Sequence, residues 1–306
     1  MAFVDSDSVS MKTHFGSNRE FGLSLVLATL GRTNELLRFF ESLKNSNNLP
    51  VEVVLVDQNE DARLEKIVQE GERMGIYIKH LHIAPLKGLS IARNHGLKAA
   101  KYALVGFPDD DCWYEQGVCD CVLERFSSDA DLDGLVVRWA ERHKDLYKNK
   151  LLNKDCQLGF RGVPIASICL FFRTDLVLDH GGFDESLGVG TWAGSSEETD
   201  LVFKVLAAGA TTKYCADVSV RHSWSSDLLP VSGGVESIFK SAISRARGTG
   251  VIYYKHSIDL FVVFRGLLSP LVRTILFKGG FIGFVFWFGT TLGRLQGYFY
   301  ALRRYG

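Results

Sequence analysis

Between residues 23 and 216 the chain alternates short apolar runs with longer stretches of helical periodicity, and this alternation restricts the fold more than any other feature. The first four runs predict strands, and the stretches between them predict helices. The strands are Leu23–Thr29, Val51–Asp57, Ile76–Leu81 and Ala103–Phe107, and the helices are Thr33–Asn45, Ala62–Met74 and Leu89–Ala100. We therefore predict an α/β fold with a parallel sheet flanked by helices, in which Thr33 caps the first helix.

The pattern becomes less regular after residue 111. The expected elements there are a helix at Tyr114–Phe126, strands at Leu132–Trp139 and Ile165–Phe172, a helix at Glu197–Ala208 and a strand at Thr212–Ala216. A glycine-rich loop between Gly181 and Ser196 carries Trp192. We expect this loop to order over a substrate and to exclude water.

Three consecutive carboxylates, Asp109, Asp110 and Asp111, follow an apolar strand directly. Open α/β sheets bind ligands at the carboxyl ends of their strands, so this position favours a site. In extended backbone Asp109 and Asp111 project to the same side while Asp110 points away. A hard divalent cation, Mg²⁺ or Mn²⁺, would relieve the repulsion between the first and third carboxylates. The alternative, that Asp111 only caps the next helix, leaves Asp109 and Asp110 unexplained.

Two further positions near strand ends have two interpretations each. Asp57 ends the second strand, where its carboxylate either accepts hydrogen bonds from a nucleobase or ribose or forms an ordinary Asx turn. Arg93 lies near the start of the helix that begins at residue 89, behind Ser90 as a candidate cap. This arrangement either binds an anion such as phosphate or leaves Arg93 solvated on the helix face.

Glu197 and Glu198 open a helix after the glycine-rich loop. Carboxylates in a first turn are stabilised by the helix dipole, so the pair either caps the helix or supplies a general base. His222 follows the last predicted strand. A lone histidine is usually structural, but beside two aspartates and a phosphate-bound metal it becomes a candidate third ligand.

The order of these motifs resembles that of family 2 glycosyltransferases of the GT-A type. The matching features, over about residues 21–225, are the apolar strand with Thr29 and Arg32, strand-terminal Asp57, GLSIARNHG, FPDDD, GGFDESLG, SEETD and VRH. Each motif is weak alone, whereas the ordered set is specific. The resemblance implies a GT-A, Rossmann-like fold with a mixed, mostly parallel sheet flanked by helices. It also implies an inverting transferase that uses a nucleotide-diphosphate sugar and Mn²⁺ or Mg²⁺, often in bacterial polysaccharide assembly.

The resemblance also implies a role for each matching residue. The donor-binding residues would be Thr29, Arg32, Asp57, Arg93, Asp109 and Asp110, with Arg93 at the base or phosphates and Asp109 toward the ribose. The metal ligands would be Asp109 and Asp111 of the DxD pair, completed by His222. Val-Asp-Gln-Asn replaces the common paired aspartates at the end of the second strand, which leaves the donor's nucleobase open.

By the same resemblance, Glu198 is the base that deprotonates the acceptor hydroxyl, and Glu197 is its neighbour and the fallback candidate. The family more often has Asp at the base position. The expected reaction transfers a sugar from a nucleotide-diphosphate sugar, UDP-sugar favoured, to a hydroxyl of a saccharide or lipid-linked saccharide in cell-surface polysaccharide synthesis. The alternatives are a sugar-phosphate nucleotidyltransferase and a non-catalytic, membrane-bound scaffold that binds sugar nucleotides.

The C-terminal part has a different composition from the rest. Residues 251–306 hold seven cations, one anion and 14 of the 36 aromatic residues, although the whole chain has zero net charge. Their longest charge-free run is 15 residues, and as a helix of roughly 22 Å it is shorter than the ~30 Å hydrocarbon core. We expect a segment that lies on an anionic membrane surface. The alternative is that these helices pack on the catalytic domain or on a second subunit, as in a homo-oligomer.

The expected domains are a mobile N-terminal arm (1–20), a GT-A catalytic domain (21–229) and a helical, basic and aromatic tail (230–306). The first 20 residues lack the pattern of a signal peptide, and the six cysteines lack zinc spacing. We therefore expect a cytoplasmic protein with reduced thiols, peripheral on the cytoplasmic face of the inner membrane. The neutral total argues against nucleic acid as a partner.

Overall fold

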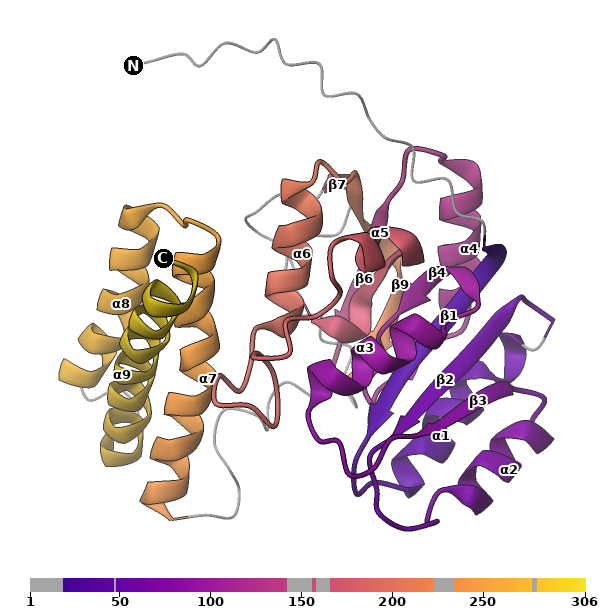
Figure 1. Cartoon of the computed structure of the whole chain (residues 1–306), viewed down its shortest axis with the longest axis horizontal. Coiled ribbons are helices and arrows are strands. Elements are labelled where there is room, and N and C mark those ends of the chain that lie inside the picture. Colours follow the sequence, from indigo (N-terminus) through magenta and orange to yellow (C-terminus); the bar gives the residue numbers. More distant parts are fainter. Residues whose placement is uncertain (1–18, 47, 142–155, 158–165, 223–233, 277–279) are drawn as a thin grey trace, which may run out of the picture.

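The computed structural model describes residues 19–46, 48–141, 156–157, 166–222, 234–276 and 280–306. Figure 1 shows a sheet flanked by helices on one side of the molecule and the C-terminal helices on the other. The described strands form a single sheet in the order β3-β2-β1-β4-β8-β6-β9-β5, with β7 paired to β9.

Parallel pairing dominates the first half of this sheet. The strands of this half, which pair only in parallel with one another, are β1 (Glu20–Thr29), β2 (Val51–Asp57), β3 (Tyr77–His82) and β4 (Tyr102–Gly106). The others are β5 (Trp113–Tyr114), β6 (Gly134–Ala140), β7 (Cys156–Gln157), β8 (Leu170–Arg173) and β9 (Thr212–Arg221). Strand β8 is antiparallel to β4 and β6, whereas β6 and β9 are parallel. The predicted mixed, mostly parallel sheet is confirmed.

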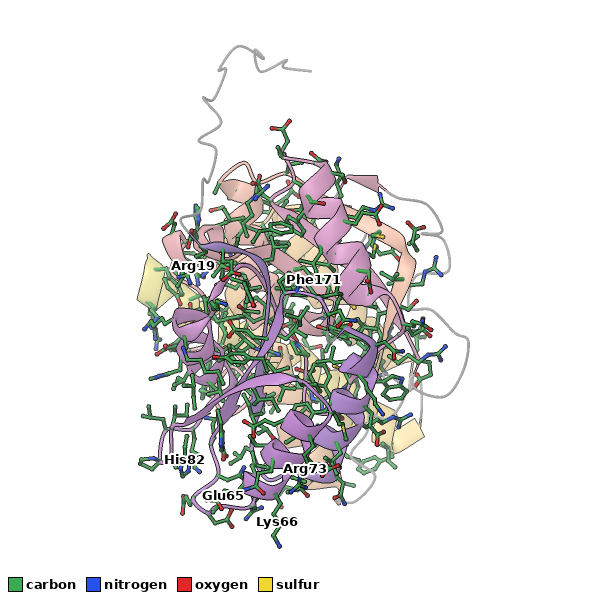
Figure 2. All side chains as sticks on the ribbon, turned by 90° about the vertical axis from the view of Figure 1, so that its right-hand side faces the viewer. Arg19, Glu65, Lys66, Arg73, His82 and Phe171 are labelled. Atoms are coloured by element: carbon green, nitrogen blue, oxygen red, sulfur yellow. The ribbon has the colours of Figure 1, made fainter. Side chains whose placement is uncertain are left out.

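The helices around the sheet are α1 (Asn34–Leu43), α2 (Glu65–Arg73), α3 (Leu89–Ala99), α4 (Val118–Ser128), α5 (Thr174–Asp179) and α6 (Glu197–Ala207), with 3₁₀ turns at Lys44–Ser46 and Ser167–Cys169. Helix α3 packs closely on β1 and β2, since a Cβ at Gly96 would overlap Val26 and Val56. Figure 2 shows Phe171 of β8 in the middle of the molecule and Lys66 of α2 at its periphery. Phe171 is fully buried in the main apolar core.

Four local predictions need correction. The helix expected from Tyr114 begins at Val118, because Trp113 and Tyr114 pair with β9 as strand β5. The strand expected from Ile165 begins at Leu170 after a 3₁₀ turn, and Ile165 lies outside the described residues. The side chain of Thr33 makes no capping hydrogen bond. Strand β1 already begins at Glu20, inside the predicted arm, whose residues 1–18 lie outside the described part.

The C-terminal part is helical as predicted, with α7 (Val235–Lys255), α8 (Leu260–Ile275) and α9 (Gly280–Tyr305). Glycines let α7 and α9 approach at backbone distance, because a Cβ at Gly250 or Gly297 would overlap main-chain atoms of the other helix. Arg294 of α9 donates to the carbonyl of Gly266 on α8. None of the described helices is long and apolar enough to cross a membrane.

Candidate active site

A cavity of about 380 Å³ lies at the carboxyl ends of β1 and β4. Six residues singled out from the sequence line it: Thr29, Arg32, Asp109, Asp110, Asp111 and His222. A bridge between Ala28 and Asp109 holds the first of the three aspartates beside the end of β1. The fold thus gathers residues from three distant segments of the chain at one edge of the sheet, as the strand pattern predicts.

Asp109, Asp111 and His222 form a cluster suited to a divalent cation. Each offers one ligand atom, and these atoms lie within 4.8 Å of one another. Nε2 of His222 is 3.0 Å from Oδ1 of Asp111. The position of His222 depends on β9, which extends five residues beyond the predicted strand end and runs directly into it. Two carboxylates and one imidazole are a donor set that fits Mn²⁺ or Mg²⁺.

Asp110 faces the end of β1. Its carboxylate accepts a hydrogen bond of 2.7 Å from Oγ1 of Thr29 and pairs with Nη1 of Arg32. The same guanidinium lies 3.0 Å from Oδ2 of Asp111. Burial raises the pKa of Asp110, although Arg32 and Thr29 act in the opposite direction. Thr29 and Arg32 therefore organise the acidic segment while they line the cavity.

Arg93 is the most deeply buried charged side chain at this site. Only 1% of the residue is exposed, so the solvated alternative is wrong. Nη2 of Arg93 donates to Asp109 over 2.8 Å and to Oγ of Ser167 over 2.6 Å, and Nη1 donates to Glu197 over 3.1 Å. Helix α3 is preceded by Gly88 as its N-cap, and Ser90 instead donates to the carbonyl of Leu187. The expected serine cap is therefore absent.

The two adjacent glutamates of α6 have different environments. Glu197 is buried and paired with Arg93, and Gly188 packs so closely that a Cβ there would lie 3.0 Å from Cδ of Glu197. Burial and, secondarily, repulsion from Glu197 raise the pKa of Glu198 well above its ordinary value of 4.5. Once deprotonated, a carboxylate with a raised pKa is a stronger proton acceptor than an ordinary glutamate.

Asp57 does not line the cavity of the acidic cluster. It is 2% exposed, and its Oδ1 accepts hydrogen bonds of 2.8 Å from both the main-chain and side-chain nitrogens of Asn59. Its Oδ2 lies 3.0 Å from Nε2 of His80. The Asx turn, one of the two interpretations of this residue, is therefore present.

Sequence reasoning missed several lining residues, among them Gln58, Lys87, Val189 and Gly190. Gln58 directly follows β2, so its place at the sheet edge was the available signal. Nζ of Lys87 donates to the carbonyl of Gln58 over 2.7 Å, which fixes the rim of the cavity. The sequence predicts that the glycine-rich loop lies over a substrate, but no pattern distinguishes Val189 and Gly190 within it. The folded loop brings them to the start of α3, where N–H of Leu89 donates to the carbonyl of Val189 over 3.1 Å.

Trp192 belongs to the same loop but does not line the cavity. Its ring contacts Tyr300 at 4.8 Å between centroids, and the guanidinium of Arg247 lies 4.3 Å from it. The loop therefore contributes Val189 and Gly190 to the cavity, while its tryptophan packs against the C-terminal helices.

Curated relatives of this chain are glycosyltransferases. Over 211 residues, which are 65% of this chain and 42% of the relative, it is 26% identical to the pre-mycofactocin glycosyltransferase of Mycobacterium tuberculosis. It is also 26% identical over 142 residues to the putative glycosyltransferase EpsH of Bacillus subtilis, covering 46% of this chain and 40% of the relative. The chain thus matches less than half the length of each of these relatives.

Solved structures share the fold. S. aureus TarS superposes with a TM-score of 0.59 at 14% identity, covering 85% of this chain and 44% of that one. TarS 1-349 in complex with UDP-GlcNAc gives a TM-score of 0.56 at 13% identity, covering 90% and 91%. The model of glycosyl transferase family 2 matches residues 24–186, more than half of the chain. The chain therefore belongs to glycosyl transferase family 2.

Proposed function

We propose that this protein is an inverting glycosyltransferase that moves a sugar from a nucleotide-diphosphate sugar to an acceptor hydroxyl. The observation that carries the proposal is the position of Arg93, which joins Asp109 of the cation cluster to Glu197 beside the candidate base. A departing diphosphate and an attacking hydroxyl must meet at one anomeric carbon. Arg93 contacts both acidic motifs, because one of its amino groups pairs with Asp109 and the other pairs with Glu197.

The cavity at the acidic segment is our candidate donor site. Arg32 and Lys87 supply positive charge at its lining, and Thr29, Gln58 and Asp110 supply polar groups for a nucleoside. TarS, which has the same fold, has been solved with UDP and with UDP-GlcNAc. UDP is accordingly the first nucleotide to test. Asp57 contributes through its Asx turn, which sets the path of the chain into Gln58.

Asp109, Asp111 and His222 are the residues that would hold Mn²⁺ or Mg²⁺. When bound, such an ion neutralises negative charge on the diphosphate leaving group. The chain adds its own cations at the cavity lining, Lys87 and Arg32, and Arg32 lies against Asp110 and Asp111. Arg93 pairs with Asp109 from outside this lining. Positive groups fixed before the reaction stabilise the charge that develops on the leaving group.

Glu198 is our candidate base, with Glu197 as the fallback. Glu197 is already engaged by Arg93, whereas the pKa of Glu198 is raised by burial, so that its deprotonated carboxylate is a stronger base than an ordinary glutamate. As the acceptor oxygen forms its bond to the anomeric carbon, the bond from that carbon to the diphosphate oxygen breaks. The hydroxyl proton moves to the Glu198 carboxylate, and single displacement inverts the anomeric centre.

A screen of UDP-, GDP- and dTDP-sugars with Mn²⁺ or Mg²⁺ tests the proposal. A donor that binds the native state raises its melting temperature. Turnover should then release nucleoside diphosphate. Release of pyrophosphate would identify a sugar-phosphate nucleotidyltransferase instead. Binding with no turnover on any saccharide or lipid-linked acceptor would favour the scaffold alternative.

Helix α8 supports our proposal that the protein works on an anionic membrane surface. Most of its large apolar side chains are exposed: Leu260, Phe261, Phe264, Leu268, Leu271, Val272 and Ile275. The described residues of α8 and α9 include arginines and no acidic residue. Figure 1 shows α8 on the side of the helical unit away from the sheet. Apolar and cationic groups together suit an anionic lipid surface better than a second copy of the same cationic face.

This placement gives the proposed cellular setting: a peripheral protein on the cytoplasmic face of the inner membrane, acting on a saccharide or lipid-linked saccharide in cell-surface polysaccharide synthesis. A lipid-linked acceptor would be presented at the surface on which α8 lies. Association into a homo-oligomer through the same helices is the competing outcome, and it is decided by the size of the protein in solution without lipid.

A further inference from the structure

A partly buried ionic cluster joins the C-terminal helices to the helix of the candidate base. Nζ of Lys255, the last residue of α7, lies 2.8 Å from Oδ1 of Asp200 on α6 and 2.6 Å from Oδ2 of Asp184. Nε2 of His256 lies 2.8 Å from the same Asp200 oxygen. The hydroxyl of Tyr305, at the end of α9, donates to Asp184 over 2.9 Å. Asp200 is completely buried and lies two residues after Glu198.

The charges in this cluster balance. Two lysines lie against two aspartates: Lys255 contacts both Asp184 and Asp200, and Lys204 contacts Asp200. The imidazole of His256 also contacts Asp200. Burial alone would favour the neutral carboxyl of Asp184, but hydrogen bonds from Lys255 and Ser186 hold its pKa below the usual range. Burial likewise opposes the charge on Lys255, yet Asp200 and Asp184 raise its pKa. Asp200 is completely buried, so removing the charge of Lys255 leaves the Asp200 carboxylate less compensated in the interior.

A second set of contacts ties the loop before α6 to the same helices. A small apolar cluster brings Leu187 and Ala193 of the loop together with Phe203 of α6, Val251 of α7 and Ala301 of α9. The main chain continues this attachment, because N–H of Gly194 donates to the carbonyl of Ser244 over 3.0 Å and Oγ of Ser195 donates to that of Arg245 over 2.6 Å. Gly248 approaches Ser195 too closely to allow a Cβ.

We infer that Lys255 is a positioning residue for the first turn of α6, so that α7 and α9 are part of the catalytic unit. Two ion pairs hold the first turn of helix α6. Arg93 pairs with Glu197 from the side of the sheet, and Lys255 pairs with Asp200 from the side of the C-terminal helices. Glu198 lies between these two anchored residues. The C-terminal helices therefore position the base carboxylate together with the sheet. The role of Glu198 in this inference rests on the proposed function.

Amide hydrogen exchange on the whole protein tests the inference without any substrate. Lys255→Met keeps the length of the side chain and removes its charge. We expect amide exchange in residues 197–201 to accelerate by about tenfold or more, while β1 and β2 keep their protection. Lys255→Arg should restore most of the protection. Lys240→Met is the matched control, since Lys240 pairs with Glu236 on the exposed surface of the same helix.

A kinetic measurement separates positioning from general stability. Lys255→Met should lower kcat for sugar transfer at least tenfold while the affinity for UDP with Mn²⁺ stays within about twofold, because no cluster residue lines the donor cavity. Unchanged exchange in α6, or equal acceleration throughout the sheet, would overturn the inference. If Lys255→Met does not fold, the same exchange measurement on Tyr305→Phe decides, because that variant removes only the hydroxyl that bonds Asp184. Exchange still decides if the unmodified protein transfers no sugar.

Discussion

Nη1 of Arg93 donates to Oε1 of Glu197 over 3.1 Å and joins residues 104 positions apart in the chain. Both side chains are almost fully buried, with 1% and 7% of their surface exposed. The other amino group of Arg93 contacts Asp109, so a single guanidinium compensates two carboxylates that belong to different motifs. The spatial relation between the cation cluster and the base helix depends on this side chain.

Substituting Arg93 should therefore destabilise the fold. Arg93→Met leaves Asp109 and Glu197 without their buried cation, and breaking a buried ion pair costs about 3–5 kcal/mol. The free energy of unfolding from a denaturant titration measures the loss. Arg63→Met is the control, because Arg63 pairs with Asp61 at the exposed surface, where solvent screens an ion pair and its contribution to stability is small. Equal effects of the two substitutions would contradict the compensating role of Arg93.

Removing the candidate base should separate binding from turnover. Glu198→Gln keeps the shape of the side chain and cannot accept the acceptor proton, so transfer should fall by about 10²–10⁴-fold. Calorimetry with UDP and Mn²⁺ should give an unchanged affinity. Glu236→Gln, in the exposed first turn of α7, is the matched control and should keep full activity. Substantial turnover by Glu198→Gln would transfer the base role to Glu197.

The pH dependence of turnover should carry the signature of Glu198. Its pKa in the folded protein is raised well above 4.5, so the protonated, inactive form persists to higher pH than for an ordinary glutamate. Turnover should thus increase as the pH rises through this elevated pKa, and the acidic limb of the kcat profile should lie above pH 4.5. A limb at or below that value would show that another group controls proton transfer.

The acidic cluster should bind divalent cations through all three members. Asp111→Asn and His222→Gln should each weaken Mn²⁺ affinity by about tenfold or more, since each removes one ligand. The thermal shift produced by Mn²⁺ with UDP should decrease in parallel, and chelation should abolish it in the unmodified protein. Asp61→Asn, at an exposed position outside the cluster, should leave both measurements unchanged. Metal binding that survives loss of His222 would place the third ligand elsewhere.

The exposed face of α8 should mediate binding to anionic lipid. The double variant Phe261→Ser with Phe264→Ser should bind phosphatidylglycerol vesicles with an affinity lower by about tenfold or more, as measured by sedimentation. The reason is that each phenylalanine buries apolar surface in the lipid. Tyr77→Ser is the control, since Tyr77 is an aromatic residue of similar exposure on β3. Higher salt should also weaken the binding.

Two results would oppose this interpretation. Equal sedimentation with uncharged phosphatidylcholine vesicles would remove the role of charge, and a dimer in lipid-free solution that the double variant dissociates would identify the face as a subunit interface. These surface variants are sharper than deletion of residues 258–306, which would also remove α9 and its contact with Asp184.

Local pattern predicted much of the sheet and its helices. The limits of β2 agree with the prediction at both ends, and α3 and α6 differ from it by one residue at the C-terminus. One error occurs at Tyr114, where strand pairing with β9 replaces the predicted start of a helix. No local signal contains such pairing, because the partner strand lies about a hundred residues away.

The sequence by itself determined the alternation of strands and helices, the placement of Asp109 and Asp111 after a strand, and the opening of α6 with two glutamates. Those features depend on spacing within short segments. Only the tertiary structure decided that Arg93 is buried between two carboxylates, that Asp57 is occupied by its own turn, and that Lys255 reaches the base helix. These are contacts between distant segments, and chain packing alone determines which charges meet in the interior.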